Sequence, residues 1–386
     1  MPLDPQTLEQ LVDTVGRFVR ERCIPLEEQV AEEDKVPDDL IEEMKALGLF
    51  GLTVPEEYGG LGLSTEEEAR VVIELGRAAP AFRSVCGTNI GIGSQGLINA
   101  GTEEQKRKYL PGVASGAIIT SFGLTEPEAG SDAAGLKTHA RREGDYWILN
   151  GTKRYITNAN VAHLLTVMAR TNPDARGASG ISAFLIERGT PGLRFGKPEK
   201  KMGQQGAHIC DVIFEDCKVP AAQMLGGEAG EGQGFRSAMK TLDRGRIHVA
   251  ALCVGMAERI IEESLKYAVE RKQFGQPIAN FQLIQAMLAD SQTEAYAMKT
   301  MVIDAARRRD AGEDAALLAS CAKLFCSEAL GRIADRGVQI HGGAGYIRSY
   351  AVERFYRDVR IVRLYEGTSQ IQQIIIARDM MRGRKA

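Results

Sequence analysis

The prolines of this chain are concentrated in its first part, where 12 of the 13 precede residue 221 and only Pro277 follows. Proline removes a backbone donor and breaks a helix interior. Residues 278–386 therefore lack the strongest helix breaker, and they are rich in helix formers such as Ala, Leu, Met, Glu and Arg. The pattern predicts long helices, with breaks at Gly312 and at the pair Gly342–Gly343.

Residues 1–118 also carry helix signals. Ser64–Glu67 and Thr102–Gln105 have the capping-box pattern, in which the first side chain and the fourth side chain satisfy each other's backbone donors. Each of these segments is expected to open a helix.

The middle of the chain has a different pattern. Short apolar runs are separated there by Gly, Asn, Asp and Pro, which is typical of strands joined by turns. These runs are Tyr146–Leu149, Leu165–Arg170, Ile181–Ile186 and Val212–Phe214.

The three patterns together predict an α+β fold. We expect an N-terminal α-helical domain at 1–118, a small middle β domain at 119–231 and a C-terminal domain resembling a four-helix bundle at 232–386. The chain has 386 residues, of which 44% are hydrophobic, which is enough for two or three sizeable cores.

Charge and hydropathy exclude several classes of protein. The net charge of −3 and the lack of a basic block argue against a nucleic-acid partner. No apolar run reaches about 18 residues, so no membrane span is expected. Residues 1–20 are amphipathic and acidic at the start, unlike a secretory or transit peptide.

Cysteine and histidine patterns limit the chemistry further. The seven cysteines form no C-x-x-C pair, which suits reduced thiols and a cytoplasmic location. The five histidines are scattered, and His248 and His341 have no partner at ligand spacing, so no metal site is expected. The G-x-G-x-x-G dinucleotide fingerprint after a strand is also absent.

One candidate for chemistry is the segment LYEGTSQIQ at 364–372. Glu366 precedes Gly367 and a helical run, so its carboxylate is expected at the mouth of a helix, where the dipole favours the ionised form. Gly367 allows a backbone or a ligand to approach closely. An ordinary capping glutamate is the alternative, since acidic residues collect in first turns.

A second candidate is FGLTEPEAGSDAAGLKT at 122–138, which contains hydroxyl and glycine positions at Thr125, Gly130 and Ser131. Hydroxyls and free backbone N–H groups suit carbonyls, flavin edges and phosphates. A turn-rich connection is the alternative. Farther on, RYITNA at 154–159 places Tyr155 before Thr157.

These segments resemble the acyl-CoA dehydrogenase family of FAD-dependent enzymes. The resemblance covers almost the whole chain, with motifs in family order. Besides LTEPEAGSD and YEGTSQIQ, they are LDRGR (242–246), ERKQFGQP (270–277), FQLIQ (281–285) and VQIHGGAGY (338–346).

The resemblance implies that FAD lies between the β domain and the C-terminal bundle, with its adenosine end held by a second subunit of a dimer of dimers. It also implies oxidation of an acyl-CoA to the trans-2-enoyl-CoA, with electron-transferring flavoprotein as the acceptor. The alternatives are an acyl-CoA oxidase that uses oxygen and a catalytically silent acyl-CoA-binding flavoprotein.

Site residues follow from the same resemblance, position by position. Glu366 matches the base that removes the Cα proton. Tyr155 departs from the family, which usually has Trp there, although tyrosine can still stack on a flavin. The cofactor positions are Phe122, Leu124, Thr125, Gly130, Ser131, Tyr155, Thr157, Arg271, Phe274, Gln282, Gln339, Gly342, Gly343, Thr368 and Gln370. The substrate positions are Ser131, Asp243, Arg246, Tyr365, Gly367 and Arg83.

Some relatives carry the base beside the arginine of the LDRGR-like segment, where this chain has Gly245. No competing base is therefore expected at that place. We expect the pKa of Glu366 near the ordinary glutamate value or below it when water surrounds the carboxylate, and higher basicity when the acyl chain excludes water. The alternative for Asp243 and Arg246 is an ion pair on a helix surface.

Arg83 lies among small and apolar residues, 18 positions before Gly101. The spacing resembles the glutaryl-CoA dehydrogenases, whose matching arginine holds a distal carboxylate. Those enzymes usually have His and Asp after the YEGT, where this chain has Ser369 and Gln370. The alternative is an arginine that snorkels from a helix end to solvent.

Overall fold

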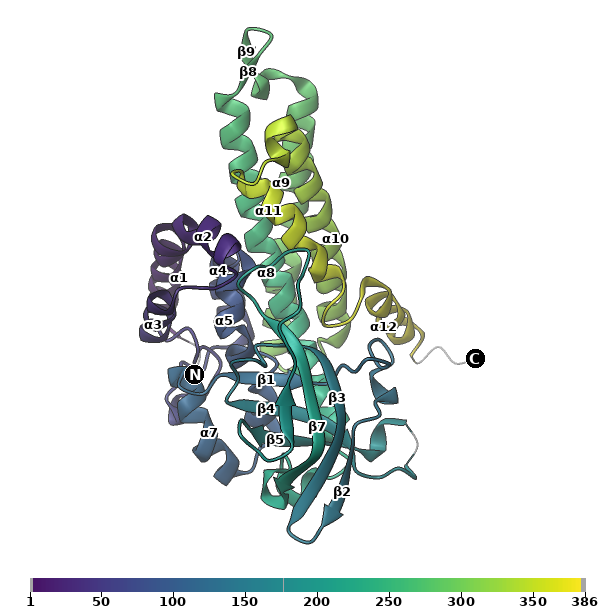
Figure 1. Ribbon diagram of the computed structural model, residues 1–386. Helices are drawn as coiled ribbons and strands as arrows, with labels where there is room; N and C mark the ends of the chain where they lie inside the picture. The colour runs from purple at the N-terminus through teal and green to yellow at the C-terminus, as the bar shows by residue number, and fades with distance from the viewer. Residues whose placement is uncertain (1–2, 176, 383–386) are drawn as a thin grey trace.

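A computed structural model describes residues 3–175 and 177–382 of the chain (Figure 1). Helices come first, a β-sheet follows, and helices form the rest of the chain. The predicted α+β class and this order of parts are confirmed.

The N-terminal helices include both segments that the capping-box pattern predicts. Ser64 accepts a hydrogen bond from the Glu67 backbone, and the Glu67 side chain accepts one from the Ser64 backbone. Thr102 and Gln105 make the same reciprocal pair. The helices are α1 (Pro5–Phe18), α2 (Glu27–Glu33), α3 (Asp38–Ala46), α4 (Thr65–Leu75), α5 (Pro80–Ile90), α6 (Gln95–Ala100) and α7 (Glu103–Ser115).

The middle of the chain forms one twisted sheet, and all four predicted strand runs lie in it. Its order is β1-β4-β2-β3-β7-β6, with β5 paired to β4. Trp147 is buried in this sheet, and its ring contacts that of Phe184. The strands are β1 (Thr120–Gly123), β2 (His139–Glu143), β3 (Tyr146–Thr157), β4 (Leu164–Arg170), β5 (Ile181–Glu187), β6 (Leu193–Phe195) and β7 (Ile209–Pro220).

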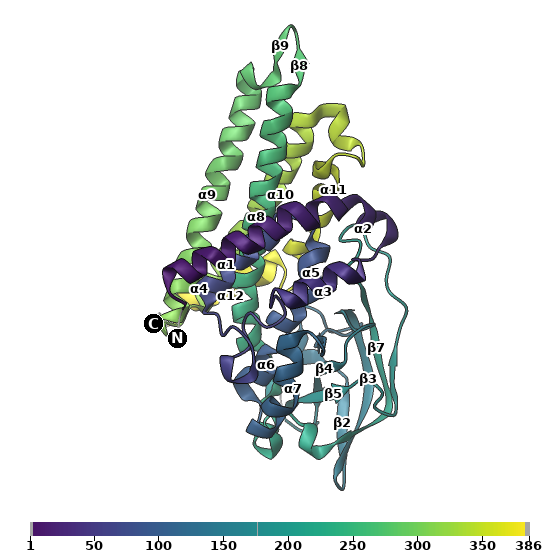
Figure 2. The same cartoon turned by 90° about the vertical axis from the view of Figure 1, so that its left-hand side faces the viewer.

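The C-terminal part is a bundle of long helices that extends away from the sheet (Figure 2). The predicted breaks occur: Gly312, with a left-handed φ of 83°, lies between α9 and α10, and α10 ends just before Gly342. The elements are α8 (Gly234–Glu270), β8 (Lys272–Gln273), β9 (Gln276–Pro277), α9 (Gln282–Asp310), α10 (Ala316–His341), α11 (Ala351–Asp358) and α12 (Ser369–Met381). The short hairpin β8–β9 lies at the far end of the bundle.

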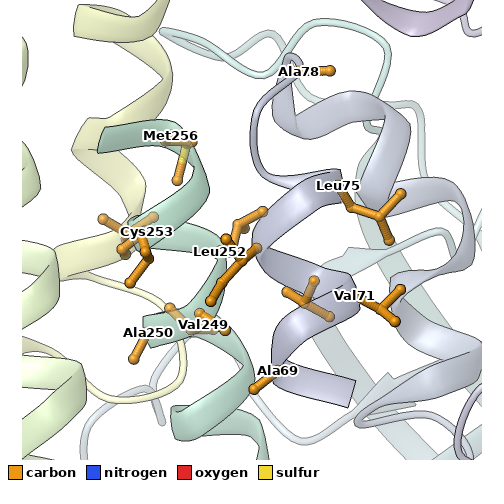
Figure 3. Packing of buried hydrophobic residues seen from close by; sticks show 14 of the residues in the cluster. Ala69, Val71, Leu75, Ala78, Val249, Ala250, Leu252, Cys253 and Met256 are labelled. Carbon is orange, nitrogen blue, oxygen red and sulfur yellow. The ribbon is translucent and has the colours of Figure 1, made fainter. Parts of the chain in front are cut away.

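Helix α8 joins the N-terminal helices to the bundle through the main apolar core. In Figure 3, Val71 and Leu75 of α4 and Leu252 and Met256 of α8 belong to one cluster of buried side chains. The two helix backbones are very close, because a Cβ at Gly255 would lie 2.0 Å from the Ile73 carbonyl oxygen. This contact brings α4 and α8 close enough for their polar side chains to meet.

The N-terminus of α8 rests against the sheet. A Cβ at Gly234 would lie 2.3 Å from the backbone carbon of Ser182 in β5. The sheet and the bundle are thus fixed to each other at this point. Within the described residues, no helix combines the length and the apolar character that crossing a membrane requires.

Candidate active site

Glu366 lies in the turn that precedes α12, and its backbone is left-handed with φ 53°. The N-cap of α12 is Thr368, whose hydroxyl accepts a hydrogen bond from the Ile371 backbone. Glu366 therefore lies ahead of the first turn and is no capping residue, because Thr368 fills that role. The turn directs its carboxylate away from α12 and toward α8.

Two side chains from the bundle hold this turn. Lys323 of α10 donates to the Gly367 carbonyl oxygen at 2.7 Å, and its side chain is fully buried. Gln372 of α12 donates to the carbonyl oxygens of Glu366 and Gly367 at 3.2 and 3.1 Å. The backbone of Glu366 is thus fixed from both sides, which limits the positions that its carboxylate can take. Lys323 could not be predicted as a site residue, because nothing in its local pattern indicates that it reaches a residue 44 positions away.

The Glu366 carboxylate lies directly against α8 at Gly245. A Cβ built on Gly245 would be 2.2 Å from Glu366 Oε2, so a side chain there would force the carboxylate to move. Oε2 is shielded from solvent and has no hydrogen-bond partner among the described residues. A shielded carboxylate oxygen without a partner is available to take a proton from a ligand.

Burial raises the pKa of Glu366, and three cations oppose that rise: Arg83, Lys323 and Arg246. The pKa is therefore above the usual value, whereas the sequence-based expectation for a solvated carboxylate was a usual or lower one. The difference arises because the folded chain already removes water from Oε2. Burial also lowers the pKa of Lys323 to about 8.

Arg83 of α5 is the cation that most strongly opposes the rise in the pKa of Glu366. Its Nε is shielded from solvent and has no partner in the described chain. The guanidinium opposes the burial-induced rise in pKa of both Tyr365 and Glu366, so it lies near both groups. The Tyr365 hydroxyl is also shielded from solvent.

Asp243 and Arg246 form an ion pair at 2.5 Å on α8. Arg246 is only 6% exposed, so the pair is not on a helix surface. The Arg246 guanidinium has an unpaired Nε within the described chain, and its charge opposes the rise in the pKa of Glu366. The structure thus places Arg246 and Tyr365 beside Glu366.

A buried polar network that sequence analysis did not predict lies next to this cluster. Glu68 of α4 accepts from His248 Nδ1 at 2.8 Å and from Arg244 Nε at 2.8 Å. Burial alone would raise the pKa of Glu68, but Arg244 and His248 outweigh it and lower the value to about 2. Glu68 resembles a first-turn acidic residue in the sequence, and its partners lie about 180 positions away.

The predicted cofactor residues divide into two groups. The first group surrounds the end of β1 and the bend of β3. Phe122 and Leu124 are buried, Gly130 and Ser131 are exposed, and Thr125 and Thr157 are half-buried. Tyr155 has a left-handed φ of 58° and is 56% exposed. Thr368 and Gln370 lie at the start of α12, on the turn that carries Glu366.

A buried ion pair anchors the loop of this first group. Lys153, fully buried on β3, binds Glu126 at 2.6 Å and also contacts the Leu124 carbonyl oxygen. Glu126 accepts in addition from the backbone N–H groups of Lys137 and Thr138. The loop from 124 to 138 is therefore anchored to the sheet at Leu124, Glu126 and Thr138, whereas Gly130 and Ser131 remain exposed.

The second group lies at the far end of the bundle. Ile340, Ala268 and Ile278 pack together there, which gathers Arg271, Phe274, Gln282, Gln339, Gly342 and Gly343 at one place. Along α8, the 25 positions between Arg246 and Arg271 span about 38 Å at 1.5 Å per residue. Within one protomer, this group is therefore remote from Glu366.

The residues of both groups fit an extended dinucleotide such as FAD. Tyr155 offers an exposed ring, and the space beside Gly130, Gly342 and Gly343 is open. Arg271 forms no ion pair with any described residue, so its guanidinium remains available for a pyrophosphate. Phe274 is 91% exposed on the hairpin.

A cavity of about 570 Å³ lies elsewhere, between the N-terminal helices and the 200–205 segment. Its lining is mostly charged and includes none of the predicted site residues. Among the residues that the structure describes, no cluster of His, Cys, Asp and Glu is arranged to hold a metal ion.

Three family descriptions match successive parts of the chain. Residues 5–117 match "Acyl-CoA dehydrogenase, N-terminal domain", residues 121–217 the middle domain and residues 232–381 the C-terminal domain.

Curated relatives of similar length align over nearly the whole chain. A 3-(aryl)acrylate reductase of Clostridium sporogenes and a probable acyl-CoA dehydrogenase of Bacillus subtilis are each 42% identical, covering 97% of this chain and 98% of the relative. An acryloyl-CoA reductase (NADH) of Anaerotignum propionicum is 41% identical, covering 97% and 94%.

Solved structures show the same architecture. Butyryl-CoA dehydrogenase from Megasphaera elsdenii matches with a TM-score of 0.94 and 35% identity, covering 99% of each chain. A chain described with the electron transferring flavoprotein of Acidaminococcus fermentans matches at 0.94 and 39%, covering 99% and 100%. The glutaryl-CoA complex of a glutaryl-coenzyme A dehydrogenase matches at 0.92 and 34%, covering 100% and 98%. A dehydrogenase from Bacillus anthracis, complexed with FAD, matches at 0.91 and 35%, covering 99% and 69%.

Proposed function

Because the chain belongs to the acyl-CoA dehydrogenase family, we propose that it oxidises an acyl-CoA thioester to the trans-2-enoyl-CoA and passes the electrons to an electron-transferring flavoprotein. The family resemblance, the oxidoreductase class and the dependence on FAD that the motifs predict are confirmed by the relatives. The direction of the reaction, the substrate and the roles of individual residues are proposals.

Glu366 is the base in this proposal. Oxidation removes a proton from Cα and a hydride from Cβ, and bound FAD supplies the hydride acceptor that no side chain can provide. Glu366 Oε2 takes the Cα proton. The single observation that carries the assignment is this shielded, unpaired oxygen, which lies against Gly245 and within the influence of three cations.

The backbone around Glu366 has a second role. Loss of the Cα proton places negative charge on the thioester oxygen, and a donor fixed in advance stabilises that charge. We assign this role to the Glu366 N–H. The bonds from Lys323 and Gln372 to the carbonyl oxygens of Glu366 and Gly367 support the assignment, because they fix the two peptides that follow this N–H.

Arg83 and its surroundings suggest the substrate. A cation beside the base is suited to a short or medium acyl group with a polar distal end, and an ω-carboxylate is one such end. The structural likeness to butyryl-CoA and glutaryl-CoA dehydrogenases supports a short acyl group. Ser131, Asp243, Arg246, Tyr365 and Gly367 are assigned to the CoA and acyl parts of the same ligand.

Reduction of an enoyl-CoA is the second candidate, because two of the relatives are named reductases. The same residues serve both directions, since Glu366 in its protonated form returns the proton to Cα. An acyl-CoA oxidase that uses oxygen, or a catalytically silent acyl-CoA binder, would use the same flavin site and differ from the dehydrogenase in how the flavin responds to acyl-CoA and to air.

The assembly proposed here is a dimer of dimers. The separation of the two cofactor groups within one protomer supports it, because a neighbour can bring its Arg271 group to this protomer's Tyr155 group.

The chain divides in this proposal into domains 1–118, 119–231 and 232–386. All seven cysteines are free and six are buried, which supports a cytoplasmic location.

One experiment separates these functions. The purified holoenzyme is mixed without oxygen with acyl-CoAs of increasing length and with ω-carboxylated ones, and bleaching of the flavin is followed. The dehydrogenase would be supported if electron-transferring flavoprotein restores the flavin colour and oxygen does not. Rapid recovery in air indicates an oxidase, and no bleaching by any acyl-CoA indicates a binder. Sustained reduction of an enoyl-CoA with a supplied electron donor, without net oxidation of the matching acyl-CoA, would indicate the reductase.

A further inference from the structure

His248 is a buried imidazole with one occupied and one free nitrogen. It is 5% exposed, its Nδ1 lies 2.8 Å from Glu68 Oε1, and its Nε2 is shielded and unpaired within the described chain. A buried nitrogen that no described group pairs with is free to bond a ligand.

The partner of Nδ1 fixes the tautomer. Glu68 is held ionised by Arg244 and His248, so it can only accept hydrogen bonds. Nδ1 must therefore carry the proton, and in a neutral imidazole Nε2 is then a hydrogen-bond acceptor. Burial lowers the pKa of His248, and Arg83 and Arg244 add to the decrease. Glu68 opposes it but does not outweigh it, so the pKa lies below the usual histidine value and the neutral ring is favoured.

The position of His248 on α8 places it beside the proposed acyl site. It follows Gly245 by three residues, so the two lie on neighbouring parts of one helix face, and Gly245 touches the Glu366 carboxylate. Arg83 acts electrostatically on both His248 and Glu366. Arg83 Nε is also shielded and unpaired, but it is a donor.

We propose that His248 Nε2 and Arg83 Nε form a subsite for an uncharged distal group that both donates and accepts, such as a hydroxyl or a primary carboxamide on the acyl chain. This inference rests on the proposed function. A hydroxyl would satisfy both free nitrogens, whereas a carboxylate would satisfy Arg83 and place its lone pairs against the Nε2 lone pair. A plain alkyl end would leave both nitrogens unpaired.

The groups that face His248 come from three elements: Glu68 of α4, Arg83 of α5 and Arg244 of α8 itself. As the pH falls and the ring gains a proton, Nε2 becomes a hydrogen-bond donor and can bind a carboxylate as well. The preference for hydroxyl over carboxylate should therefore decrease at low pH.

The test uses three acyl-CoAs of one chain length: pentanoyl-CoA, 5-hydroxypentanoyl-CoA and glutaryl-CoA. Saturation of anaerobic flavin bleaching in the holoenzyme gives a Kd and a limiting rate for each. We expect the wild-type enzyme to bind the hydroxy compound most tightly. His248→Leu should weaken its binding about three- to tenfold, the range of one neutral hydrogen bond, and should spare pentanoyl-CoA. His248→Gln, which can present an amide oxygen, should restore part of the loss.

Equal weakening for all three compounds would assign His248 a purely structural role and overturn the subsite. The same holds for a wild-type enzyme that binds pentanoyl-CoA as tightly as the hydroxy compound, and for a hydroxyl-to-carboxylate preference that does not change with pH. These outcomes leave the dehydrogenase intact, because pentanoyl-CoA would still bleach the flavin. Bleaching by none of the three would overturn the proposed function together with the subsite.

Discussion

The carboxylate of Glu366 occupies the space that a side chain at position 245 would need, since a Cβ on Gly245 would lie 2.2 Å from Oε2. Position 245 and position 366 therefore cannot both carry a carboxylate in this geometry. Gly245 lies inside α8, where Gly costs about 0.5–1 kcal/mol relative to Ala.

Gly245→Ala is expected to displace the Glu366 carboxylate and to slow flavin reduction by acyl-CoA at least tenfold, while FAD stays bound. The rate of anaerobic bleaching measures the effect. Gly331→Ala on α10 is the control, because a Cβ there meets nothing closer than 3.8 Å. Wild-type rates in Gly245→Ala would show that the base is held differently.

Glu366→Gln should keep the flavin and bind acyl-CoA, yet abolish its reduction. The amide has the shape of the carboxylate but cannot accept the Cα proton, so binding and chemistry should separate. Ligand-induced shifts in the flavin spectrum report binding, and bleaching reports chemistry. Reduction near the wild-type rate would place the base elsewhere.

Lys323→Met should move the acidic limb of the pH profile of flavin reduction to higher pH. Lys323 has its pKa lowered to about 8, so it is a cation below that pH and lowers the pKa of Glu366. Without the cation, Glu366 ionises only at higher pH, and the base is lost earlier on acidification. Lys299→Met, which breaks an exposed pair with Glu258, is the control. An unmoved midpoint would limit Lys323 to a structural role.

Arg83→Ala should reduce transition-state stabilisation for a dicarboxylyl-CoA by about 1.5–3 kcal/mol, the scale of a charge-assisted hydrogen bond. The reaction of butyryl-CoA should be unaffected. The ratio of kcat/KM for the two substrates measures this difference. Equal losses on both, or no activity with any ω-carboxylated substrate, would remove Arg83 from carboxylate recognition.

Arg271→Ala should reduce FAD retention, because the unpaired guanidinium at the far end of the bundle is suited to a pyrophosphate. The subunits should remain associated. The FAD content after gel filtration and the mass of the eluted species measure the two effects. Arg141→Ala, on the exposed strand β2, is the control. A wild-type protein that is a monomer and takes up no FAD would contradict both the assembly and the cofactor position.

Local signals predicted much of the fold. The capping boxes at 64–67 and 102–105, the break at Gly312 and the strand runs are all encoded within a few residues, so they can be read without tertiary information. Motif order then indicated the family and placed Glu366 among the candidate site residues.

Long-range contacts could not be predicted in this way. Lys323 reaches Gly367 only because α10 and the turn before α12 pack together, and Glu68 meets His248 only through the contact of α4 with α8. The raised pKa of Glu366 has the same origin, since burial depends on the assembled bundle and not on the neighbours of Glu366 in sequence.

Because α8 is one continuous helix, the orientation of one end about the helix axis fixes the orientation of the other. The helix has 37 residues and carries Gly245 and His248 near one end and Arg271 just beyond the other. Loss of one residue between them would shorten the helix by about 1.5 Å and turn one end by roughly 100° relative to the other. Insertions and deletions in this stretch would therefore misalign two remote surfaces at once, although substitutions there can be absorbed locally.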